Sequence, residues 1–321
     1  MTDYYLRVID DGMSITEEFW AFEKVVAHQG IIPSQFGTHH ADPGEDIMIT
    51  LQKRGFSPEQ FHKSLLGPGK YFPRMARPSS TRSECSPGRN PDQSTAARNI
   101  RATSTGQLHA LIHELQQICR VVHPIEHNFS AYGHEIRNII VIACTEVEAQ
   151  WKNILVANDQ RADDRVDYVK LSLPMKLREY RVGLPWYPWL DPIAPFENWA
   201  PPRRGEKQRL PWYDAYNAVK HDREKNFAEA KLIYAVESVT GCFVMLCAQY
   251  GWDFARRAEA AGDAFFLLID VPKWRPSEIY IPPYGETSQA QPHPFGSSGS
   301  PKGTHDHAER ALTFHKPFCD F

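Results

Sequence analysis

The sequence has little of what marks the common classes of enzyme or binding protein. Its 321 residues include only six cysteines, and none of them forms a CxxC pair. A disulfide framework is therefore not expected, and thiols within apolar helical stretches should behave as small hydrophobes. The formal net charge is −3 at pH 7, so no global field attracts nucleic acid or an acidic membrane. Any such binding has to come from a local basic patch.

Long apolar runs and phosphate-binding glycine loops are missing as well. No stretch reaches about 18 uncharged apolar residues, so no transmembrane helix is predicted. The first residues, MTDYYLRVIDDG, are polar and acidic, unlike a secretory signal peptide. No GK[ST] follows a glycine-rich loop, and no GxSxG occurs. Together with the scattered cysteines, these absences predict a reduced, cytoplasmic protein without a membrane partner.

Helical periodicity is what the sequence does have. Residues 105–122 and 131–157 carry apolar residues at three- and four-residue spacing, which predicts two amphipathic helices. A third element is predicted over about 212–250, where apolar residues repeat as in the seam of a bundle. Residues 184–204, LPWYPWLDPIAPFENWAPPRR, are too rich in proline for a helix and predict a long aromatic loop. We therefore predict a mostly α fold, a four- to five-helix up-and-down bundle.

Residues 1–66 are predicted as a small irregular N-terminal region of unknown function. A short strand is expected over Tyr4–Ile9. A helix is expected to start near Thr16, because acidic residues there precede the apolar Phe19 and Trp20.

Composition divides the rest of the chain into three parts. Residues 67–103 are predicted as a disordered linker, because proline, serine, arginine and glycine dominate there without apolar periodicity. The helical bundle is predicted over 104–284. Residues 285–321 contain the low-complexity stretch ETSQAQPHPFGSSGS and are predicted as a disordered tail.

The most specific stretch is WYDAYNAVKHDREKNF, in which an aromatic lead-in runs into a dense polar cluster. If one continuous helix spans 212–250, Asn217 and His221 face the apolar seam at the open end of the bundle, and Tyr216 and Lys220 point away. Polar groups at such a place need hydrogen-bond partners, because an unpaired buried donor costs about 1–3 kcal/mol.

Candidates for these partners lie on the helix predicted over 131–157, namely Glu135, Glu146 and Glu148. Two interpretations of the cluster stay open. In the first, His221 is a general acid or base beside Asn217, while Lys220 and Arg223 hold a phosphate. In the second, His221 and Asn217 are buried structural residues that fix the register of the helices.

A basic run precedes the cluster and begins with Arg203 and Arg204. Trp212 follows it and offers a ring on which a base can stack. Nearby acidic residues dilute the charge, and the alternative is a solvated loop with buried aromatic residues. His109 and His113 are spaced like zinc ligands, but no third ligand is evident, so neither a metal nor a cofactor is predicted.

The residues LPWYDAYNAVKHDR, preceded by PFENW and by RNIIVIACTEVEAQWKNIL, resemble the HEPN superfamily, the all-helical "higher eukaryotes and prokaryotes nucleotide-binding" domains. More narrowly, they are similar to a large set of bacterial proteins that share the pattern PF..W and WY.aYN.vKHdR. The resemblance covers about residues 105–285. It implies a bundle that is usually a homodimer. For many members it implies a metal-independent ribonuclease of toxin, phage-defence or RNA-processing systems, with an antitoxin-like partner in the toxin systems.

The motif of the family is an arginine, commonly followed by Asn, Asp or His, and then a histidine further along. Asn217 and His221 match it, whereas Tyr216 stands where the arginine is implied. A tyrosine lacks the permanent charge and the fork of donors that arginine brings to a phosphate, so Lys220 or Arg223 would have to substitute. The resemblance thus implies a protein that associates with RNA or a nucleotide, as an active or a degenerate ribonuclease. The alternative is a non-catalytic helical interaction module.

Overall fold

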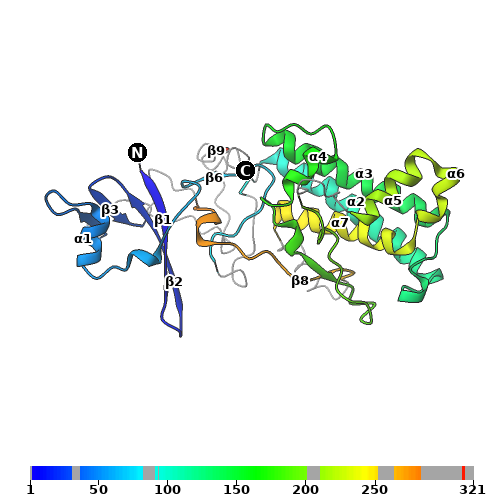
Figure 1. Cartoon of the computed structure of the whole chain (residues 1–321), viewed down its shortest axis with the longest axis horizontal. Coiled ribbons are helices and arrows are strands. Elements are labelled where there is room, and N and C mark those ends of the chain that lie inside the picture. The colour runs from blue at the N-terminus through cyan, green and yellow to red at the C-terminus, as the bar shows by residue number, and fades with distance from the viewer. Residues whose placement is uncertain are drawn as a thin grey trace. The chain divides into compact units, whose positions relative to one another are not determined.

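The computed structural model describes residues 2–30, 37–81, 91–92, 94–200, 210–251, 264–282 and 313–314 (Figure 1). The chain forms two compact units. The first contains Met1–Phe72, Arg77–Pro91 and Trp274–His315, and the second contains Pro73–Ala76, Asp92–Lys273 and Lys316–Phe321.

A five-stranded antiparallel sheet forms the first unit, in the order β4-β3-β2-β1-β5. Its strands are β1 (Asp3–Asp10), β2 (Ile15–Phe22), β3 (Val26–Gln29), β4 (Thr38–His40) and β5 (Phe61–Lys63). Strands β1 and β2 pair along their whole length, from Asp3 opposite Phe22 to Asp10 opposite Ile15. The turn between them passes through Gly12 at a φ of 78°, where glycine carries no steric penalty.

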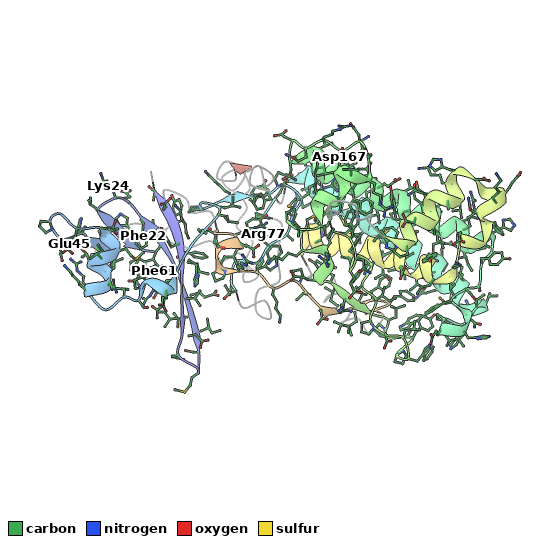
Figure 2. All side chains as sticks on the ribbon, viewed as in Figure 1. Phe22, Lys24, Glu45, Phe61, Arg77 and Asp167 are labelled. Carbon is green, nitrogen blue, oxygen red and sulfur yellow. The ribbon has the colours of Figure 1, made fainter. Side chains whose placement is uncertain are left out.

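One face of the sheet packs against helix α1 (Ile47–Lys53). Successive side chains of a strand point to opposite faces, so Trp20 and Phe22 of β2 share the face that Phe61 of β5 also occupies. These rings enclose Leu51 of α1 in the core of the unit. Figure 2 shows Phe22 and Phe61 between α1 and the sheet.

Short elements complete the first unit: the 3₁₀ turns η1 (Pro58–Gln60) and η6 (Pro276–Glu278) and the parallel strands β6 (Lys70–Tyr71) and β9 (Thr313–Phe314). Arg77, labelled in Figure 2, is buried here. Its guanidinium lies 4.3 Å from the ring centroid of Phe72 and donates to the Glu278 carbonyl at 3.0 Å. Burial lowers the pKa of Arg77.

The second unit is helical. Its α-helices are α2 (Thr95–Val121), α3 (His134–Ala157), α4 (Arg165–Tyr168), α5 (Pro211–His221), α6 (Arg223–Asn226) and α7 (Leu232–Tyr250). Its 3₁₀ turns are η2 (Glu126–Asn128), η3 (Val169–Leu171), η4 (Leu177–Glu179) and η5 (Phe227–Glu229). The antiparallel strands β7 (Arg181–Gly183) and β8 (Leu267–Asp270) belong to the same unit.

Helix α7 lies at the centre of this unit. The Cys242 thiol donates to the Ala143 carbonyl, and the Gln249 amide donates to Gln150. Both bonds join residues that are 99 positions apart, so α3 and α7 run parallel. Helix α7 is long and apolar enough to cross a bilayer, but 83% of that window is buried inside the protein. It is therefore packed as a core helix of this unit.

Aromatic rings from α4, α5 and the loop over 184–200 pack around Trp151 of α3. The ring of Trp151 stacks on Trp199 at 4.5 Å between centroids and an interplanar angle of 28°. Phe196, Tyr213 and Trp212 contact it from other sides. Because these residues are almost completely buried, their rings hold the loop and α5 against α3.

The prediction of a mostly α, all-helical fold is wrong, because the first unit is built on a sheet. The segment predicted as a helix from Thr16 is strand β2. Its aromatic residues Phe19, Trp20 and Phe22 fit a helical spacing, but aromatic residues also favour strands. All eight residues of β2 pair with β1. The N-terminal region is therefore a folded unit and not an irregular segment.

The prediction of a disordered linker over 67–103 is wrong for the residues that the structure describes. Strand β6 lies within this range, and α2 begins at Thr95. Ser94 caps α2 by accepting a backbone hydrogen bond from its first turn. Within the predicted linker only residues 82–90 and 93 lie outside the described residues, and the predicted tail lies outside them apart from β9.

The continuous helix predicted over 212–250 is also wrong. Helix α5 ends at His221, and Asp222 caps α6 by accepting from the amide of Lys225 at 3.3 Å. An aspartate that bonds to nearby backbone amides competes with the helical pattern. Helix α7 begins only at Leu232. The helical phase of α7 therefore does not determine which way α5 faces.

The ring cluster predicts a large effect of truncating its central residue. Trp151→Ala should lower the free energy of unfolding of the helical unit by about 3–5 kcal/mol, because it removes a fully buried ring and leaves a cavity. Urea unfolding of the full chain, followed by far-ultraviolet circular dichroism, measures this loss. Trp186→Ala, in the loop over 184–200 and half exposed, is the control and should cost less than about 1 kcal/mol. Equal losses in the two variants would contradict the assigned packing.

Candidate functional site

Helix α5 carries most of the predicted site residues, and its first turn fixes its orientation. Pro211 occupies the first helical position, where its missing amide is harmless. Trp212 and Tyr213 follow and are buried in the ring cluster. The indole of Trp212 donates to the Pro195 carbonyl at 2.8 Å. The buried face of α5 then continues through Tyr216 and Val219.

The carboxylate of Glu148 in α3 accepts hydrogen bonds from two tyrosine hydroxyls on this face of α5. The Tyr213 hydroxyl donates to Oε1 of Glu148, and the Tyr216 hydroxyl donates to Oε2 at 2.9 Å. Lys220, one turn further along α5, donates from Nζ to the Tyr216 hydroxyl at 2.7 Å. The Lys220 ammonium lies 4.0 Å from Oε2 of Glu148. These four residues form one connected network, here called the Glu148 network.

The charges within the Glu148 network balance. Burial, followed by the hydrogen bond to Glu148, raises the pKa of Tyr213, so this phenol stays a neutral donor at physiological pH. The hydrogen bond to Tyr216 raises the pKa of Lys220, so the ammonium stays charged. One carboxylate and one ammonium are thus joined through hydroxyls, an arrangement that ties α3 to α5.

The predicted orientation of the polar cluster is wrong in two respects. His221 is the last residue of α5 and is exposed, instead of facing the apolar seam. Tyr216, predicted to point away, is only 1% exposed. Asn217 is partly buried, and its amide donates to the Tyr213 carbonyl one turn earlier at 2.9 Å. Helix α5 ends before α7 begins, so the apolar face of α7 does not determine which residues of α5 are buried. The aromatic residues of α5 determine its buried face instead.

The glutamates that were predicted to support the site have different hydrogen-bond partners. Glu148 is a partner of the cluster, through Tyr216 and Lys220. Glu146 instead accepts from the Gln150 amide at 2.8 Å. Gln150 accepts in turn from Gln249, which also accepts from Arg74 at 3.0 Å. This second chain of polar groups links α3 to α7 and does not involve Asn217 or His221.

The predicted basic and stacking residues do not form a surface in the described chain. Arg203 and Arg204 lie outside the described residues. Arg223 begins α6, and its side chain is likewise outside the description. Trp212 is buried, and its indole nitrogen is already bonded, so its ring is not accessible to a base. Of the residues predicted to contact a phosphate, Lys220 is the one whose side chain the structure describes as exposed.

Two features of the site were missed by the sequence analysis. Tyr213 was not assigned as a partner of Glu148, although its spacing from Tyr216 places both on one face when α5 is projected alone. Glu237 of α7 was not singled out.

Within the described part of the chain, no group of three or more His, Cys, Asp or Glu side chains is placed to hold a metal ion.

No family model matches the chain, and no curated protein and no solved structure matches it. The resemblance to the HEPN superfamily therefore stays a prediction that rests on the motif in α5. The chemistry of the site follows from the side chains of α3 and α5. They form a satisfied network of carboxylate, phenols and ammonium, and Lys220 and His221 reach the surface beside it.

The side chain of Glu237 in α7 is a carboxylic acid that is largely buried in the helical unit. Burial in α7 raises its pKa to about 7. Among the described residues, none hydrogen-bonds to its buried Oε2. A folded-state pKa above the ordinary 4.5 means that the fold favours the protonated acid. The resulting stability is complete below about pH 4.5 and is lost as the pH rises through about 7.

Glu237→Gln should therefore remove a pH dependence from the helical unit. At pH 8 the variant should be more stable than the wild type by up to about 3 kcal/mol, and at pH 5 the two should differ little. Urea unfolding at both pH values measures the difference. Glu135→Gln, at an exposed position of α3, controls for the loss of one negative charge. An equal pH dependence in wild type and Glu237→Gln would contradict the assignment.

Proposed function

We propose that the helical unit binds the phosphate groups of RNA or of a nucleotide at the exposed edge of α5, and that it does not cleave RNA. One observation supports the proposal most. Lys220 is held by the Tyr216 hydroxyl while its side chain stays 46% exposed, and the exposed His221 follows it directly.

The geometry of Lys220 suits an anion. Its ammonium has three donors, and the bond to Tyr216 uses one of them. The ammonium lies 4.0 Å from Oε2 of Glu148, beyond hydrogen-bond distance, so Tyr216 is its one hydrogen-bond partner among the described residues. A lysine that is held in one place loses less rotamer entropy when it binds a phosphate. The exposed imidazole of His221 follows Lys220 directly. The exposed Lys225 lies in α6, where its ammonium is 3.5 Å from a carboxylate oxygen of Asp222.

Two observations argue for binding without cleavage. Metal-independent cleavage of RNA needs a base for the 2′-hydroxyl proton and a cation at the developing charge. Tyr216 stands where the family resemblance implies an arginine, and its hydroxyl is committed to Glu148. No described residue hydrogen-bonds to the ring of His221, so nothing among them orients the imidazole as a general base.

A purely structural role is the second candidate, because the Glu148 network satisfies its own polar groups. In that case α5 only ties the bundle together, as in a non-catalytic interaction module. The proposal keeps the further expectations that follow from the family resemblance. These are a homodimer, a cytoplasmic location, and an antitoxin-like partner if the protein belongs to a toxin system.

RNA binding by charge variants tests the proposal. Lys220→Ala should weaken the binding of labelled RNA by roughly 5-fold and lower the slope of log affinity against log salt by about 0.7, because one phosphate contact is lost. Fluorescence anisotropy in EDTA measures both values, and a denaturing gel should show intact RNA. Lys24→Ala, an exposed lysine of the first unit, is the matched control and should bind like the wild type.

Two outcomes would overturn the proposal in different ways. If the wild type cleaves RNA in EDTA and His221→Ala does not, the protein is a ribonuclease. If neither the wild type nor the control binds RNA or a nucleotide, the structural role of α5 is favoured.

A further inference from the structure

Aromatic side chains reach the surface at the end of the helical unit where α2 gives way to α3. Trp189 of the aromatic loop is 50% exposed. Its indole nitrogen donates to the Pro124 carbonyl at 2.9 Å, which fixes the ring against the turn over 122–133. The His123 imidazole lies 4.8 Å from the Trp189 ring, and Tyr187 contacts the same ring edge-on.

A second group of rings lies at the other end of the same turn. Tyr132 is 55% exposed and meets Phe227 of η5 edge-on, with 5.8 Å between the ring centroids. The His134 imidazole lies 4.8 Å from Phe227. Tyr132 and Lys231 also form a backbone bridge, so the turn is attached to the start of α7.

The two groups of rings and the end of α5 share one end of the helical unit. Pro124 and Tyr132 are separated by a chain that spans at most about 29 Å when extended, and η2 shortens it. The Asn226 amide donates to the Ala218 carbonyl at 3.4 Å and so attaches α6 to α5. Phe227 follows directly. Figure 1 shows α6 at the same end of the unit as the turn between α2 and α3.

We propose that this end surface, formed by Tyr132, Trp189 and the neighbouring imidazoles, stacks the bases of single-stranded RNA. The inference rests on the proposed function and names its substrate class. Exposed rings are stacking platforms for bases in proteins that bind single strands. The indole donor of Trp189 is already used, so its ring offers a face and no hydrogen bond to a base edge. The strength of RNA binding at these rings should therefore depend little on the base sequence of the RNA.

Stacking, and not charge, favours a single strand over a duplex at this surface. Glu126, Glu135 and Glu224 are exposed on the elements that carry these rings, and Lys225 and Lys231 are paired with Asp222 and Glu229. Such a mixture creates no strong positive field for the phosphates of a duplex. In a duplex the bases are stacked on one another, whereas a single strand can place them on the rings. Stacking then supplies most of the affinity, and phosphate contacts at Lys220 supply a smaller part.

Ring variants of the full chain test this inference with a labelled RNA of about 12 nucleotides, within the usual range of such sites, and with the matching duplex. The single strand should bind more tightly than the duplex. Trp189→Ala and Tyr132→Ala should each weaken binding of the single strand by about 5- to 100-fold, the effect of one lost stacking contact. Trp189→Phe and Tyr132→Phe keep a ring and should retain most of the affinity. Leu173→Ala, an exposed apolar residue of the same unit, should have no effect.

The outcomes separate this inference from the proposed function. If the single strand and the duplex bind equally and the ring variants bind like the wild type, stacking is wrong. A remaining effect of Lys220→Ala would then still support phosphate binding. If the wild type binds neither form of RNA, both the inference and an RNA-binding function are overturned. Losses that are equal in Trp189→Ala and Trp189→Phe would also contradict stacking, because a ring remains in the second variant.

Discussion

The contact between α3 and α5 is the constraint on which the rest of the helical unit depends. Trp151 of α3 is fully buried among rings from α5 and from the aromatic loop. Glu148, one turn earlier on the same helix, accepts from Tyr213 and Tyr216. Apolar packing thus sets the position of α5, and the carboxylate sets its rotation. Both are needed to place Lys220 and His221 at the surface.

The burial of Tyr216 explains why position 216 of the motif does not place a cation at the surface. The phenol is directed into the interior, where its hydroxyl joins a carboxylate to an ammonium. An arginine at this position would bring a permanent charge into a place that is almost closed to solvent. A buried charge needs a partner of opposite charge, and Glu148, the acidic residue of this network, already faces the Lys220 ammonium at 4.0 Å. The network therefore suits a tyrosine, and the positive charge at the surface comes from Lys220.

The sequence predicted local helical structure better than it predicted orientation. The helix expected over 131–157 is confirmed as α3. Glu148 does contact α5, but through Tyr213, Tyr216 and Lys220 and not through Asn217 or His221, the residues for which a partner was expected. The apolar spacing in β2 was misread as helical, because the pairing that makes it a strand comes from β1 and β3. The rotation of α5 was also misread. The apolar phase of α7 does not fix this rotation. The aromatic residues of α5 fix it by packing around Trp151 and donating to Glu148, and these partners lie on α3, outside the pattern of α5 and α7.

A double-mutant cycle between Glu148→Gln and Tyr216→Phe tests the central claim most directly, with the free energy of unfolding of the helical unit as the measured quantity. If the carboxylate and the phenol stabilise the contact between α3 and α5 together, the two substitutions should be non-additive, with a coupling of about 1–2 kcal/mol. A coupling near zero would contradict the claim, because the loss of the phenol hydroxyl would then be independent of the carboxylate that is assigned as its partner.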